Sequence, residues 1–78
     1  MPDFSSSHER DAWVKDHADY FTVVRYLGPR KGYERYEVPT LAEAEQLAGR
    51  MAEKAGVPYM IYAVSGIHDA FMSKVGKK

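Results

Sequence analysis

The chain has 78 residues, contains no cysteine, and carries eleven basic and eleven acidic side chains. A chain of this length forms one small domain, since it buries only about 60% of the surface that it exposes when unfolded. The missing cysteine excludes disulfides and thiolate metal sites and is compatible with a reducing compartment, while the charge balance argues against nucleic-acid binding through a general basic excess.

Hydropathy argues against a membrane location. The longest nearly unbroken apolar run, 57–64, has eight residues and contains a proline, whereas a membrane-spanning helix needs about 20 residues. The N-terminus is polar from its third residue and lacks the apolar segment of a signal peptide. We therefore expect a soluble cytoplasmic protein with a single domain over 1–78 and mobile ends at 1–6 and 76–78.

The first predicted element is a short helix over 8–17. Ser6 and Glu9 are three residues apart, as in a capping box at the start of a helix. A helix of about ten residues is unstable by itself, so we expect Trp13 to anchor it on the sheet or at the sheet's edge. The apolar side chains of this helix are Ala12, Trp13 and Val14.

Two strands are predicted next, over 19–27 and 32–38. The first is rich in β-branched and aromatic residues, and the second alternates more loosely. The segment between them has a glycine at each end, Gly28 and Gly32, and a proline inside, which is typical of a turn. The two strands therefore form a hairpin with a loop of four or five residues.

The length of this loop sets the pairing of the strands, because a slip of one residue turns every side chain to the other face. A five-residue loop pairs Arg25 with Arg35 and Val24 with Tyr36. A four-residue loop pairs Arg25 with Tyr36 and places the arginine among apolar groups. The first register is slightly favoured, since like charges on a solvated face can move apart.

The main helix is predicted to begin after Thr40, which forms a capping box with Glu43. Gly56 suits the residue after the last turn, and Pro58 prevents continuation. Alanines dominate the apolar stripe, so helix and sheet can approach closely, and Gly49 would allow the same at a cost of about 1 kcal/mol. The stripe consists of Leu41, Ala44, Leu47, Ala48, Met51 and Ala55.

The C-terminal part is predicted to contain a third strand over 58–64, whose residues are apolar on both faces, as in the interior of a sheet. Ser65 and Gly66 then form a turn. Residues 67–75 have two interpretations: a helix, from their spacing, or an edge strand over 70–75. The strand is favoured, because a hairpin is the shortest connection.

These elements predict an α+β fold: a mainly antiparallel sheet of three or four strands, ββαβ or ββαββ, with one long helix on one face. The short N-terminal helix is expected at an edge or on the second face. One long helix covers one face only, and tyrosine rings favour surfaces that are partly dry and partly wet. The other face is therefore predicted to be a contact surface. The strands hold all six tyrosines, Tyr20, Tyr26, Tyr33, Tyr36, Tyr59 and Tyr62.

Catalytic and metal sites are not predicted. Ser65, His68 and Asp69 are close in sequence, but no G-x-S-x-G motif marks a nucleophile. The three histidines, His8, His17 and His68, lack the spacing of a metal site. We therefore expect no enzymatic activity, no metal and no cofactor.

The predicted hairpin combines cations with aromatic rings. Cations can bind phosphates while rings stack on bases, so this combination suits a nucleic-acid-binding ribbon. Glu34 and Glu37 lie in the same ribbon and would repel phosphates. The residues concerned are Arg25, Arg30, Lys31 and Arg35, together with Tyr26 and Tyr33.

The stretch from Tyr20 to Ala55 combines a strand, a glycine-bounded turn, a strand and the helix start Thr40-Leu41-Ala42-Glu43-Ala44. It is similar to the arm-type DNA-binding domains of phage integrases, which place a three-stranded sheet before such a helix; here two strands precede the helix and another follows. The whole chain resembles small uncharacterised bacterial and prophage proteins with a ββαβ or ββαββ core. In size and simplicity it resembles small phage-encoded inhibitors, including anti-CRISPR proteins.

The resulting prediction is a non-enzymatic protein–protein interaction module that forms a homodimer or binds a partner protein, for example as a phage-encoded inhibitor of a host complex. The alternative is a nucleic-acid-binding ββα-type domain that uses the basic hairpin. No membrane and no small-molecule substrate is expected. The predicted partner-binding residues are Tyr20, Tyr26, Tyr33, Arg25 and Arg35, with Arg30 and Lys31 at the turn.

Overall fold

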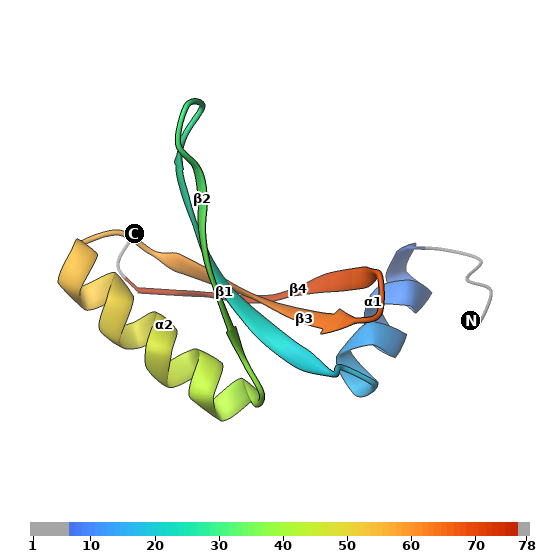
Figure 1. Ribbon diagram of the computed structural model, residues 1–78. Coiled ribbons are helices and arrows are strands. Elements are labelled where there is room, and N and C mark those ends of the chain that lie inside the picture. Colours follow the sequence, from blue (N-terminus) through green and yellow to red (C-terminus); the bar gives the residue numbers. More distant parts are fainter. Residues whose placement is uncertain (1–6, 77–78) are drawn as a thin grey trace.

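The computed structural model describes residues 7–76, which form two helices and an antiparallel sheet in the strand order β2-β1-β3-β4 (Figure 1). The predicted α+β fold is confirmed in its four-stranded ββαββ form. The elements are α1 (Ser7–Asp16), β1 (Tyr20–Gly28), β2 (Gly32–Val38), α2 (Leu41–Ala55), β3 (Tyr59–Ser65) and β4 (His68–Val75).

The long helix α2 begins and ends where the sequence predicts. The Thr40 hydroxyl accepts a hydrogen bond of 3.2 Å from the backbone N–H of Glu43, which confirms the N-cap. Gly56 ends the helix with a left-handed φ of 74°, and its N–H donates to the Ala52 carbonyl at 2.8 Å. The residues that α2 buries are all small, so its backbone lies close to the sheet: Ala44, Ala48 and Ala52.

Both helices pack on the same face of the sheet, toward its two ends (Figure 1). The alanines of α2 pack against β1 and β3, while α1 places Val14 against Ala63 of β3 and Ala70 of β4. Phe21 and Met72 contact both groups, so the core is one continuous layer. The short helix therefore does not cover the second face, which was one of its two expected positions.

The anchor of α1 agrees with the prediction only in part: Trp13 packs against the cluster of Val14, Ala63 and Ala70, but Val14 is the more deeply buried residue. Val14 is completely buried, whereas Trp13 is only partly buried and stacks on the ring of His17, with 4.5 Å between ring centroids. Ala12, predicted on the apolar side, is exposed. Val14 packs against the small side chains Ala63 and Ala70, and Trp13 packs at the margin of the same cluster. The predicted cap Ser6 lies outside the described residues.

The pairing of β1 with β2 shows that both predicted registers are wrong. Gly28 pairs with Gly32 beside the turn, but a bulge between Tyr26 and Gly28 shifts the remaining pairs by one residue. Arg25 consequently lies opposite Glu34. The bulge thus replaces a pair of like charges with a pair of opposite charges, and an argument from loop length alone could not include it.

The C-terminal residues form the predicted edge strand rather than a helix. Ser65 pairs with His68, so the turn between β3 and β4 contains only Gly66 and Ile67 and is shorter than predicted. β3 lies between β1 and β4, as its apolar sequence indicates. Among residues 7–76, neither helix has the length and apolar character that crossing a membrane requires.

Gly49 offers a test of the packing of α2. A Cβ atom at this position would meet nothing within 4 Å, so the helix does not approach the sheet closely at Gly49, as the sequence had suggested it could. We expect Gly49→Ala to raise the free energy of unfolding by about 1 kcal/mol, because alanine has the higher helix propensity. Urea denaturation measures this change.

Gly76 provides the contrasting control. Its φ is 116°, and a Cβ there would lie 2.5 Å from the Cβ of Ala52. Gly76→Ala should therefore lower the free energy of unfolding. Equal responses of the two variants would contradict the packing described for α2.

Candidate interaction surface

The face of the sheet opposite the helices is not covered by any helix or strand of residues 7–76. Successive side chains of a strand point to opposite faces, so the residues that alternate with the core residues define this surface, which we call the open face. It consists of Tyr20, Thr22, Val24 and Tyr26 on β1, Tyr33, Arg35 and Glu37 on β2, Met60, Tyr62 and Val64 on β3, and Asp69, Phe71 and Lys74 on β4.

The open face carries five aromatic rings, four of which are held in two pairs. Tyr26 and Tyr33 are 54% and 64% exposed, and their ring centroids are 5.2 Å apart. Tyr62 and Phe71 meet edge to face at 5.8 Å, with Phe71 46% exposed. Rings fixed against each other lose little conformational freedom when a partner binds. The open face therefore presents preorganised apolar area.

A hollow of ≈450 Å³ lies on this face. Thr22 and Val24 of β1 lie between the longer side chains of β2 and β3, and Thr22 is almost fully buried. The surface is thus a groove along β1 with higher walls on both sides. The other residues that line it are Tyr33, Arg35, Tyr62 and Asp69.

The end of the β1–β2 hairpin extends beyond the four-stranded part of the sheet. β1 pairs with β3 only from Tyr20 to Val24, so its remaining residues pair with β2 alone. Figure 1 shows this two-stranded ribbon projecting away from both helices and from β4. Tyr26 and Tyr33 lie on the ribbon, and therefore its orientation determines where these two rings are presented.

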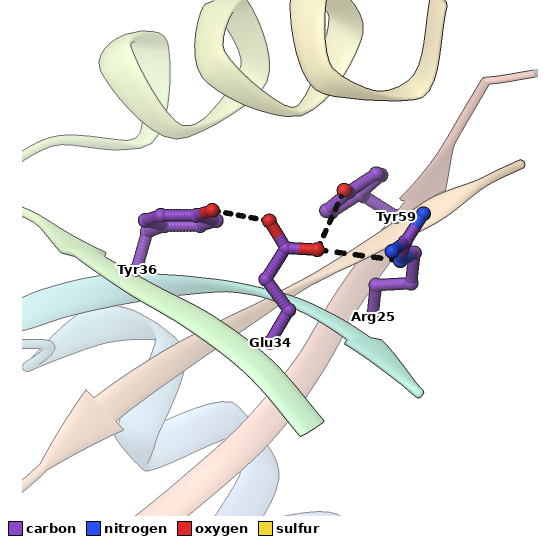
Figure 2. A network of polar contacts seen from close by, with 4 residues as sticks. All are labelled: Arg25, Glu34, Tyr36 and Tyr59. Atoms are coloured by element: carbon purple, nitrogen blue, oxygen red, sulfur yellow. Dashed lines mark hydrogen bonds and ion pairs between the residues drawn. The ribbon is translucent and has the colours of Figure 1, made fainter. Parts of the chain in front are cut away.

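A polar network holds the ribbon at its base, on the face that points toward α2 (Figure 2). Glu34 accepts hydrogen bonds from the hydroxyls of Tyr36 and Tyr59. Its Oε1 also lies 3.3 Å from Nε of Arg25, an ion pair whose geometry falls short of a hydrogen bond. The Arg25 guanidinium lies over the Tyr59 ring at 5.6 Å, a cation–π contact.

The charges of this network influence one another. The hydrogen bond from Tyr36 is the largest cause that lowers the pKa of Glu34, and partial burial opposes it. The same bond raises the pKa of Tyr36. Burial, and then the hydrogen bond to Glu34, raises the pKa of Tyr59. An ionised Glu34 therefore joins two tyrosines and one arginine of three different strands.

The structure places the predicted partner-binding residues in three locations. Tyr20, Tyr26, Tyr33 and Arg35 lie on the open face. Arg25 lies on the opposite face, in the polar network. The turn contains the exposed residues Arg30 and Lys31.

The prediction missed the part of the open face that β3 and β4 supply. Met60 and Tyr62 belong to a run that is apolar on both faces, so alternation did not reveal which residues point outward. Phe71 belongs to the segment whose helix or strand character was left open. The register of β3 against β1 is the information that identifies which of these residues point outward.

The suggested catalytic and metal groupings are not assembled. Ser65 and His68 lie opposite each other and share the helix-covered face, whereas Asp69 pairs with Val64 and lies on the open face. Within residues 7–76, no three histidine, aspartate or glutamate side chains come together as a metal site requires.

Comparison of the chain with protein-family models, with curated proteins and with solved structures found no match.

The polar network predicts how acid affects stability. The pKa of Glu34 is below its ordinary value of 4.5, so the unfolded chain binds a proton at this carboxylate more readily than the folded chain does. The stabilisation is therefore complete above the ordinary pKa and is lost as the pH falls through the lower folded value. We expect Glu34→Gln to be less stable than wild type at neutral pH, and the difference to shrink as the pH falls below 4.5.

Thermal melts across this pH range measure the effect. Glu53→Gln is the matched control, because Glu53 is an exposed glutamate on α2 that belongs neither to the network nor to the open face. If both variants showed the same dependence on pH, the role given to Glu34 would be wrong.

Proposed function

We propose that the protein is a non-enzymatic binding module that recognises a protein partner through the open face. The observation that best supports this proposal is the position of both helices on one face of the sheet. The other face is left with paired aromatic rings. Large exposed apolar patches on small domains commonly mark interaction sites, and tyrosine and arginine are enriched among the residues that dominate binding energy.

The charges of the open face favour a protein partner over a polyanion. Arg35 and Lys74 are balanced by Glu37 and Asp69. A nucleic acid would require a clear excess of positive charge. A protein surface can match both signs, and complementary charges then give specificity.

The hairpin has fewer available cations than its sequence indicates. Arg25 is paired with Glu34 on the helix side, and Arg35 lies 3.7 Å from Glu37. Arg30 and Lys31 remain at the turn. Nucleic-acid binding by the ribbon is accordingly the less favoured function and serves as one outcome of the test below. The absence of cysteine is compatible with the cytoplasm, which we propose as the setting.

Affinity capture with two baits tests the proposal. Wild type and the double variant Tyr26→Ser/Tyr33→Ser are immobilised and exposed to nuclease-treated lysate from cells that also produce a second, differently tagged copy of the chain. We expect wild type to retain a defined protein, either the second copy or another chain, that the variant loses. The variant should still fold, since a cross-strand aromatic pair contributes only about 0.5–1 kcal/mol.

Arg50→Ser/Glu53→Ser is the control bait, because these exposed residues lie on α2, away from the open face. It should retain the same protein as wild type. Identical proteins on all three baits would contradict binding through the open face. In a parallel capture from untreated lysate, a protein that wild type retains there but not from nuclease-treated lysate would favour the nucleic-acid alternative instead.

A further inference from the structure

We infer that the open face binds a second copy of the same chain. The two sheets would pack face to face around a two-fold axis that runs across the strands, between the levels of Arg35 and Glu37. This inference rests on the proposed function and names the partner of the same surface. It comes from the order of side chains along two neighbouring rows of the sheet.

The register defines these two rows, each of which crosses all four strands. Val24 lies opposite Arg35 and also opposite Met60, and Met60 lies opposite Lys74. The first row is therefore basic at both ends and apolar in the middle. The second row consists of Glu37, Thr22, Tyr62 and Phe71.

A two-fold axis between the rows places the first row of one copy over the second row of the other. Arg35 then faces the partner's Glu37, and the same pair forms a second time by symmetry. Lys74 faces the partner's Phe71, which allows a cation–π contact. Met60 faces the partner's Tyr62. This arrangement brings no two like charges of the rows together, so the surface is complementary to itself.

The size of the face agrees with a weak but specific dimer. The strands have seven to nine residues. With about 3.3 Å between successive residues and about 4.8 Å between neighbouring strands, the open face has an area of about 500 Å² per copy. Two copies thus bury about 1,000 Å², at the lower limit for a specific interface, so we expect a dissociation constant on the order of micromolar. Tyr33 and Tyr62, at the walls of the hollow, are the side chains long enough to fill the space above Thr22 and Val24.

Sedimentation equilibrium of single charge reversals tests the arrangement. Arg35→Glu sets carboxylates against each other at both symmetric positions, and Glu37→Arg does the same with guanidinium groups. Each variant alone should dimerise at least about tenfold more weakly than wild type. Circular dichroism shows whether each variant is folded.

Mixing the two variants is the decisive step. In a mixed dimer, every reversed charge faces an opposite charge, so a 1:1 mixture should regain dimers at least as stable as those of wild type. The pair that Arg35 and Glu37 form within one chain cannot produce this result, because that pair is broken in both variants. Recovery on mixing therefore reports contacts between two chains.

Arg50→Glu and Glu53→Arg are controls with the same net charges, placed on the exposed side of α2. Each should dimerise like wild type, which separates the local contact from the effect of total charge. A monomeric wild type at concentrations up to about 1 mM would overturn the inference, as would variants that stay monomeric when mixed.

These outcomes are distinct from a failure of the proposed function. A monomer whose open-face tyrosines are still required to retain another protein would contradict the second copy alone. A dimer could also form through the β2 edge of the sheet. Hydrogen exchange would then show protection of the outer backbone amides of β2, and Tyr26→Ser/Tyr33→Ser would be as dimeric as wild type. That result would overturn the face-to-face arrangement.

Discussion

One-sided packing of the helices is the constraint on which the rest of the structure depends. The sheet of four strands has two faces, and the alanine stripe of α2 and the Val14 side of α1 both use the same one. This arrangement gives a small chain one continuous core, joined by Phe21 and Met72. The consequence is that the strand side chains on the other face have no helix of the described chain to pack against, and most of them are aromatic, aliphatic or long. The proposed binding surface is therefore a direct consequence of how the core is built.

The polar network around Glu34 links this core to the surface. The Glu34 carboxylate finds its two phenol partners and its guanidinium partner on the helix side, where Tyr59 is almost fully buried. Glu34 and Arg25 are therefore held there, and the alternation of the strands sends Tyr26, Tyr33 and Arg35 to the opposite face. Charge pairing on one face thus sets which residues the ribbon presents on the other.

The sequence predicted those parts of the fold that local chemistry determines. The cap at Thr40, the end of α2 at Gly56 and the glycine-bounded turn after β1 each depend on a few adjacent residues, and all three are confirmed. The bulge that pairs Arg25 with Glu34, and the deeper burial of Val14 than of Trp13 in α1, depend on contacts between distant segments. The same division applies to the candidate surface: its tyrosines on β1 and β2 were identified, whereas Met60, Tyr62 and Phe71 required the register of a strand that is apolar on both sides.

The position of β3 between β1 and β4 has a consequence for how this protein can change over evolution. Tyr59, Ile61 and Ala63 point into the core, while Met60 and Tyr62 point outward from the same seven-residue strand and are partly exposed. Substitutions at alternate positions therefore act on two separate properties. A lineage could alter its recognition of other molecules through Met60 and Tyr62 and keep its folding intact through Tyr59, Ile61 and Ala63, with no insertion, deletion or new element.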